Sequence, residues 1–205
     1  MIALMAWRNI WRNKARSLVI MLSVAIGLLA GLGVLALYKG MMKSRVRTVI
    51  DSEVGHLQIH YPAFKKENHP VFVLPNATAL LKKIHALPEV QATAPRSLAE
   101  GMLVTTTGSA GVQINGVVPA LEDSVSQLKR KIVAGKGFHA GKKNEMLIGK
   151  KLADKLKLKL GGKLVLTFTD TADNLVSSAF RVAGVYQSGN APLDERNVYV
   201  SLTTL

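Results

Sequence analysis

This chain of 205 residues lacks cysteine altogether, and its first 50 residues lack acidic side chains. The absence of cysteine excludes disulfides, thiolate metal sites and cysteine nucleophiles, although such a chain suits either redox compartment. The first 50 residues do contain eight Lys and Arg, which leaves an excess of +8 there and +6 in the remainder. These basic residues match no nucleic-acid-binding motif, so we do not expect nucleic acid as a partner.

Catalytic motifs are also missing. The nearest approach to a phosphate-binding loop lies at residues 137–143, where the glycine spacing is wrong and no Ser or Thr follows the lysines. His56 and His60 have metal-ligand spacing, but no acidic residue lies between them and the other histidines are scattered. No G-x-S-x-G is present. We therefore predict that the chain is not an enzyme and binds no cofactor or metal ion.

Two adjacent carboxylate pairs remain, Glu122 with Asp123 and Asp194 with Glu195. Neighbouring residues on a strand would point to opposite faces, so neither pair forms an acid–base couple. Both pairs lie in expected loops or helix starts, and we prefer the second interpretation, in which the acidic residues complement the dipole at a helix N-terminus.

A long uncharged stretch is the main feature that the chain does have. Residues 18–38 contain no charged side chain over twenty-one positions, which corresponds to a helix of about 31 Å, close to the roughly 30 Å hydrocarbon thickness of a bilayer. We predict a transmembrane helix at 18–38. A signal peptide is the alternative, but its apolar region is usually shorter. The basic residues that flank the stretch are Arg8, Arg12, Lys14 and Arg16 before it, and Lys39, Lys43, Arg45 and Arg47 after it.

Residues 1–17 contain an amphipathic pattern that is typical of a membrane interface. Trp7 and Trp11 are four residues apart on one face of a helix expected at 3–15, and Arg8, Arg12 and Arg16 are rotated away from them. Indoles favour the headgroup level and guanidinium groups favour phosphate, so we predict that these five residues anchor the segment. A plain cytoplasmic extension of the span is the alternative. Since four basic residues lie on each side, charge alone does not decide the orientation.

Small residues form a stripe within the predicted span. Ser23, Gly27 and Gly31 recur every fourth position. In lipid, small residues allow two helix backbones to approach closely, so the stripe predicts a helical partner. The alternative is that glycine is simply common in membrane helices.

Beyond the span, the sequence predicts a helical stalk at 39–53 and an α+β domain at 54–205. Helices are expected at 76–87, with Asn76 as the cap, and at 150–156. Strands are expected at 54–60, 90–95, 101–107, 110–118, 145–148, 163–169, 175–186 and 197–201. The six lysines at 150, 151, 155, 157, 159 and 163 form either a solvated face or a docking surface for lipid headgroups or an acidic partner.

Three stretches together resemble the permease subunits of the MacB, FtsX and lipoprotein-releasing (LolC/LolE) group of ABC transporters. Residues 6–17 read AWRNIWRNKARS, like the start of these permeases. Residues 144–156, NEMLIGKKLADKL, and 161–166, GGKLVL, are similar to their MacB-like periplasmic core. Residues 180–186, FRVAGVY, and 197–202, NVYVSL, look like its closing strands.

The resemblance implies a bacterial inner-membrane protein with a cytoplasmic N-terminus and with residues 39–205 outside the membrane. It implies three kinds of partner: an ABC ATPase that supplies the ATP hydrolysis, a second permease subunit, and a lipoprotein or periplasmic protein. Family members continue into three further spans, whereas this sequence has no second apolar run before Leu205. We therefore expect the chain to correspond to the N-terminal half of such a permease.

Three functions are compatible with this pattern. The first is a permease that couples ATP hydrolysis to movement of its outer domain for lipoprotein or amphiphile export. The second is an FtsX-like subunit that signals to a cell-wall hydrolase outside the membrane. The third is a single-pass anchored binding module.

Overall fold

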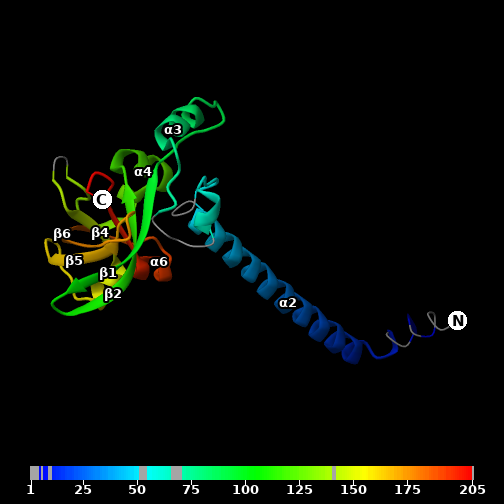
Figure 1. Ribbon diagram of the computed structural model, residues 1–205. Helices are drawn as coiled ribbons and strands as arrows, with labels where there is room; N and C mark the ends of the chain where they lie inside the picture. The colour runs from blue at the N-terminus through cyan, green and yellow to red at the C-terminus, as the bar shows by residue number, and fades with distance from the viewer. Residues whose placement is uncertain are drawn as a thin grey trace. The chain divides into compact units, whose positions relative to one another are not determined.

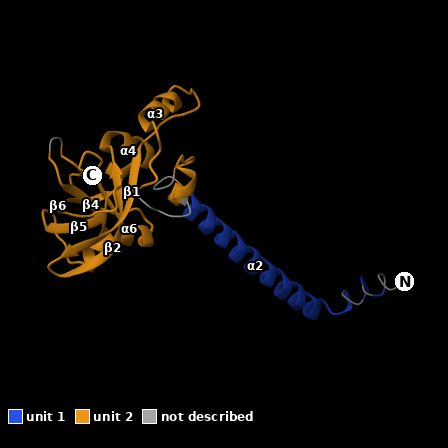
Figure 2. Cartoon of the chain, viewed as in Figure 1, with its two compact units in different colours: residues 1–47 blue, residues 48–205 orange. Residues whose placement is uncertain are grey.

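The computed structural model describes residues 5, 7, 8, 11–50, 55–65, 71–139 and 142–204, without the side chain of Lys65. The chain divides into two compact units, Met1–Arg47 and Thr48–Leu205 (Figure 2). The α+β class with one long N-terminal apolar helix is confirmed.

Helix α2 (Lys14–Val49) dominates the first unit as one uninterrupted helix of 36 residues (Figure 1). It includes the whole predicted span and continues through the predicted stalk as far as Val49. Residues 51–54, the end of that stalk, lie outside the described residues. At 1.5 Å per residue the helix is about 54 Å long, which exceeds the roughly 30 Å of hydrocarbon. Its C-terminal part therefore extends into an aqueous or headgroup layer when the apolar part spans a bilayer.

In the part of the chain that the structure describes, the second unit contains seven strands, six of which close into a ring. Hydrogen bonds link them in the order β3-β6-β4-β7-β2-β1-β5, and β5 pairs in turn with β6. Six strands therefore form a hydrogen-bonded ring, and β3 continues the edge of β6 next to β5. The strands are β1 (Arg96–Thr105), β2 (Gly108–Val117), β3 (Ile132–Gly135), β4 (Glu145–Gly149), β5 (Lys163–Thr169), β6 (Leu175–Tyr186) and β7 (Asn197–Ser201).

The two faces of the ring bury separate apolar clusters. Along β4, Met146 and Ile148 belong to the larger cluster and Leu147 to the smaller one, as the two-residue period of a strand requires. Helix α5 (Lys150–Lys155) contributes Leu152 to the larger cluster. The smaller cluster includes Tyr186 and Tyr199, whose rings meet edge-on with centroids 5.2 Å apart, and Leu128 from the 3-10 helix η3 (Leu128–Lys131).

The second unit also contains elements whose bounds the sequence pattern did not predict. These are α4 (Pro119–Ser126), η3, β3 and α6 (Ala191–Arg196). In addition, β1 begins at Arg96, five residues before the expected start, because its early residues pair with the end of β2.

Two predicted strands are wrong where the structure describes them. Residues 55–60 and 90–95 form no strand, and Val54 lies outside the described residues. Leu57 and Ile59 do alternate with polar residues, but they are 81% and 46% exposed. This segment has no partner strand among the described residues, so the alternating pattern does not lead to a hydrogen-bonded ladder. His56 and His60 therefore do not lie on the polar face of a strand.

The expected helix at 76–87 forms as α3 (Ala77–His85), which stands apart from the sheet (Figure 1). Asn76 occupies the cap position, but its side chain makes no capping hydrogen bond because its backbone is left-handed, with φ 55°. The short 3-10 helix η2 (Pro62–Lys65) precedes α3 in the chain.

Candidate functional site

The surface of α2 is apolar and uncovered. From Leu18 to Tyr38 its large apolar side chains are 50–71% exposed, and no residue of α2 is buried. A water-soluble helix would need one polar face or a protein cover. Because α2 has neither over its apolar stretch, its surface suits hydrocarbon.

The small-residue stripe is open in space. A Cβ added at Gly27 or Gly31 would meet nothing within 4 Å. The Ser23 hydroxyl donates a hydrogen bond of 2.8 Å to the Val19 carbonyl, one helical turn earlier. Its proton is therefore satisfied inside the helix, and Ser23 contributes to the stripe through its small size.

The predicted anchoring residues lie on the surface of the N-terminal segment. Trp7 and Trp11 are 63% and 57% exposed, and their ring centroids are 6.4 Å apart. The ammonium group of Lys14 lies 5.5 Å from the centroid of the Trp11 ring, within cation–π range. Arg8, Arg12 and Arg16 are also exposed, and Ala6, Asn9 and Ile10 lie outside the described residues. The sequence prediction of interfacial contact stays a prediction.

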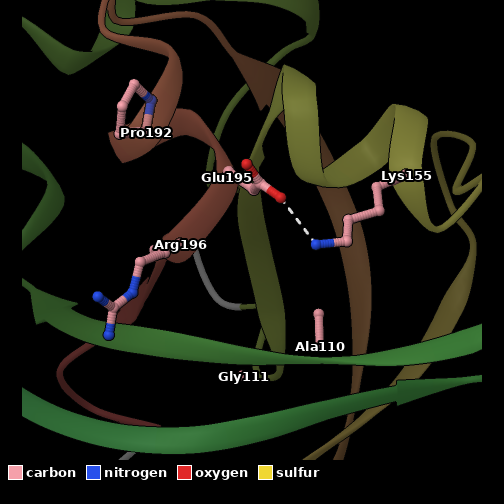
Figure 3. A pocket seen from close by; sticks show the side chains of 6 residues that line it. All are labelled: Ala110, Gly111, Lys155, Pro192, Glu195 and Arg196. Atoms are coloured by element: carbon pink, nitrogen blue, oxygen red, sulfur yellow. Dashed lines mark hydrogen bonds and ion pairs between the residues drawn. The ribbon is translucent and has the colours of Figure 1, made fainter.

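A shallow pocket of about 340 Å³ opens between β2, α5 and α6 in the second unit (Figure 3). Lys155 and Glu195 form an exposed ion pair beside it, with Nζ and Oε1 2.7 Å apart. The hydrogen bond from Lys155, aided by its charge, lowers the pKa of Glu195. The other residues that line the pocket are Ala110, Gly111, Pro192 and Arg196. The pocket offers charged groups for a polar ligand and no nucleophile.

A buried ion pair connects the start of β1 to α4. Arg96 donates from Nε to one carboxylate oxygen of Glu122 at 2.9 Å and from Nη2 to the other at 2.6 Å. The Glu122 side chain is 0% exposed and that of Arg96 is 17% exposed. The expectation that Glu122 serves only as an acidic residue near a helix start was incomplete, because the residue is in the first turn of α4 but is ion-paired inside the fold.

The other carboxylate pair is also divided by the fold. Asp194 is buried in α6 and accepts a hydrogen bond of 2.9 Å from the Ser188 N–H. Its neighbour Glu195 faces Lys155 instead. Within the described ranges, no three His, Asp or Glu side chains come together as a metal site would require.

A carboxylate also orders the β5–β6 turn. One oxygen of Asp170 accepts hydrogen bonds from the N–H groups of Ala172 and Asn174, at 2.8 and 2.9 Å. The Asn174 hydrogen bond is the main cause of a lowered pKa at Asp170. We therefore assign Asp170 a structural role in this turn.

The predicted lysine run extends over more than one element. Lys150, Lys151 and Lys155 belong to α5, and the charges of Lys151 and Lys155 act on Glu195. Lys163 begins β5, where its backbone pairs with Arg181 of β6. Lys163 therefore has a basic neighbour that lies outside the run.

Comparison with known proteins identifies the family. Residues 17–205 match the family described as the MacB-like periplasmic core domain. No curated protein matches the chain.

Two solved structures are similar at low identity. One is the extracellular domain of the ABC-type transporter YknZ from Gram-positive bacteria, with 18% identity, a TM-score of 0.44 and coverage of 60% of each chain. The other is a permease-protein domain from Porphyromonas gingivalis, with 17% identity, a TM-score of 0.42 and coverage of 58% of this chain and 49% of that one. The present chain thus spans about half to three-fifths of these structures. Since the family match covers nearly its whole length, the chain belongs to the MacB-like periplasmic core domain family of ABC-transporter permeases.

Proposed function

We propose that the chain belongs to a MacB/LolC/LolE-type permease that moves its outer domain to export a lipoprotein or another amphiphile. The observation that supports it most is the uncovered apolar helix α2 joined to a domain of the permease family. The sequence contains no G-x-x-x-x-G-K-[ST] phosphate-binding loop, so we assign ATP hydrolysis to a partner ATPase. A second permease subunit completes the proposed assembly.

We propose further that the N-terminus is cytoplasmic, that α2 crosses the bacterial inner membrane and that Trp7, Arg8, Trp11, Arg12 and Arg16 anchor its entry. The exposed indoles and guanidinium groups beside the apolar helix support this placement. In this arrangement α2 transmits movement between the membrane and the outer domain, since it is one helix from Lys14 to Val49 without a break.

The orientation is tested with single cysteines, which the natural chain lacks. Ser109→Cys, on the exposed start of β2, should react with a membrane-impermeant maleimide added to intact spheroplasts. Asn13→Cys should react only after the membrane is opened. The reverse pattern would contradict the proposed orientation, and equal labelling in a soluble fraction would contradict membrane insertion.

The partner helix is tested on the stripe. Gly27→Leu with Gly31→Leu should weaken co-purification with the second permease subunit, because side chains then separate the two backbones. The fold of this chain itself should not change, since both positions are open. Gly33→Leu is the matched control: it is equally open but is rotated about 120° from Gly27 and about 160° from Gly31, at 100° per residue. If both variants lower co-purification equally, or neither does, the stripe is not the packing surface.

The assembly is tested by cross-linking in native membranes followed by identification of the partners. An ABC ATPase and a lipoprotein carrier in the complex would support the export function. An ABC ATPase together with a cell-wall hydrolase would instead support the FtsX-like alternative. A chain that cross-links to no ATPase would favour the anchored binding module and contradict the proposal.

A further inference from the structure

Five basic side chains gather where β4, β5 and β6 meet; we call this group the basic rim. It is formed by Lys142, Lys143, Lys159, Lys163 and Arg181, all of them exposed. Only Lys159 and Lys163 belong to the lysine run noted in the sequence. The fold adds Arg181 from β6 and the two lysines that precede β4.

Backbone hydrogen bonds bring four of these residues together, and Lys142 precedes Lys143 in the chain. Lys163 and Arg181 are directly opposite each other in the β5–β6 ladder. The Arg181 N–H donates to the Asn144 carbonyl at 2.9 Å, which places Lys143 beside it. The Val182 N–H donates to the Gly162 carbonyl at 3.1 Å, and the Gly162 N–H donates to the Lys159 carbonyl at 3.0 Å. These bonds place the turn that contains Lys159 next to the strand that contains Arg181.

The basic rim has little neutralising charge. None of its five residues makes an ion pair with the residues that the structure describes. On the other edge of β6, Arg181 is directly opposite Glu145 of β4, the acidic neighbour in the ladder. Glu145 is only 11% exposed, and its two oxygens accept from the His139 backbone N–H and ring at 2.7 and 2.8 Å. Like charges directly opposite each other on a ladder are destabilising. Because Glu145 offsets one of the two charges, the row formed by Lys163, Arg181 and Glu145 keeps a net charge of +1, which an external anion would neutralise.

An apolar side chain lies in the same turn. Leu160, next to Lys159, is 49% exposed although it is large and apolar. It is followed by Gly161 and Gly162, which add no side chain of their own. Cations around an exposed leucine are typical of surfaces that rest in the headgroup region of a bilayer, with the apolar group directed toward the acyl chains.

We propose that the basic rim docks on anionic phospholipid headgroups of the bilayer in which α2 is inserted. The inference rests on the proposed membrane insertion and on no particular cargo. Lipid is favoured over an acidic protein because a chain tethered to a bilayer meets headgroups at high effective concentration. Each Lys or Arg near an anionic surface strengthens binding by about fivefold, so two charges amount to about 25-fold.

The experiment uses the full chain in lipid nanodiscs with one fluorescent label. Ala179→Cys places the label on the exposed face of β6, two residues from Arg181. Thr171→Cys, at the far tip of the β5–β6 hairpin, is the matched control. It lies about 25 Å from Arg181 along the strand direction. Headgroup-quencher lipid is included in neutral phosphatidylcholine discs, or in discs with phosphatidylglycerol at roughly one in three.

Docking predicts that the label at residue 179 is quenched in anionic discs at low salt, that high salt abolishes the quenching, and that the label at residue 171 stays unquenched. Lys159→Gln with Lys163→Gln should shift the docking equilibrium about 25-fold toward the free domain. Lys159→Arg with Lys163→Arg should restore it. Lys150→Gln with Lys151→Gln, an equal change of charge on α5, should leave it unchanged.

Three results would overturn the inference. Equal quenching in neutral and anionic discs would exclude a charge-dependent contact. Equal loss in the α5 variant would show that only net charge matters. Absence of quenching in anionic discs, with an acidic peptide binding to the Lys159 and Lys163 side chains, would point to an acidic protein partner. If the chain does not enter nanodiscs at all, the proposed membrane insertion itself fails, which separates the two proposals.

Discussion

Replacing Arg96 by methionine tests the buried ion pair at the junction of β1 and α4. The change removes both hydrogen bonds to Glu122 and leaves its carboxylate without that partner at 0% exposure. Removing one member of a buried pair costs about 3–5 kcal/mol, because the remaining charge keeps its desolvation penalty. For a protein of this size, each kcal/mol lowers the melting temperature by about 2–4 °C, so we expect a decrease of about 6–20 °C.

A double-mutant cycle then separates the ion pair from the packing. Arg96→Met combined with Glu122→Leu removes both charges, so the double variant should recover most of the stability lost by the single variant. The assay is urea unfolding followed by the near-ultraviolet circular dichroism of Tyr186 and Tyr199. Tryptophan fluorescence would not serve, because both tryptophans lie in the N-terminal segment.

A stabilising role of the buried pair is contradicted if Arg96→Met costs less than about 1 kcal/mol, the range of exposed pairs. It is also refuted if the double variant is as unstable as the single one, since the cost would then come from lost packing around Arg96. Hydrogen exchange of peptides from α4 gives an independent readout. Exchange should rise there first, because the pair joins α4 to the sheet.

Two further predictions concern α5 and α6. Gly149→Ala should lower the urea midpoint and reduce the free energy of unfolding by about 1–3 kcal/mol, because the added Cβ would overlap the Asp194 backbone carbonyl. Gly111→Ala is the control and should leave the midpoint unchanged, because a Cβ there meets nothing within 4 Å. Lys155→Gln should raise the pKa of Glu195 from its lowered value toward 4.5, as a carboxyl titration followed by NMR would show. Since the pKa of Glu195 is lowered in the folded chain, the ion pair stabilises the fold above pH 4.5, and this contribution is lost as the pH falls through the pKa of the folded state. An unchanged pKa of Glu195 in Lys155→Gln would show that Lys155 does not cause the lowering.

Local patterns predicted the later strands well. The expected bounds of β5, β6 and β7 agree with the structure at both ends. Each of these strands is a run of β-branched and apolar residues between turn residues, such as Gly161-Gly162 before β5. Information of this kind lies within a few residues, so no tertiary contact is needed to read it.

The short helices had a usable signal. Both α4 and α6 carry a proline in the first turn, Pro119 and Pro192, where its missing N–H is not needed. Asn190 even precedes α6 at the cap position, although its side chain makes no capping hydrogen bond. Attention to the proline positions would have predicted both helices, but not their burial.

Contacts across the fold could not be predicted in the same way. Arg96 and Glu122 are 26 residues apart, and nothing local to either one indicates the other. The early part of β1 is similar, because Arg96 to Glu100 become a strand through pairing with the end of β2. In both cases the partner supplies the stabilisation, and the partner is chosen by the closed ring of strands.

Charge shows the limit of sequence reading most clearly. Proximity in sequence predicts one surface for the lysines at 150–163, yet Lys150 and Lys151 belong to α5 whereas Lys163 begins β5. The ladder then joins Lys163 to Arg181, eighteen residues later, and the β4 contact adds Lys143. Strand register thus determines which charges share a surface, and register depends on long-range pairing. A binding surface of this fold must therefore be sought across its strand ends and not along its sequence.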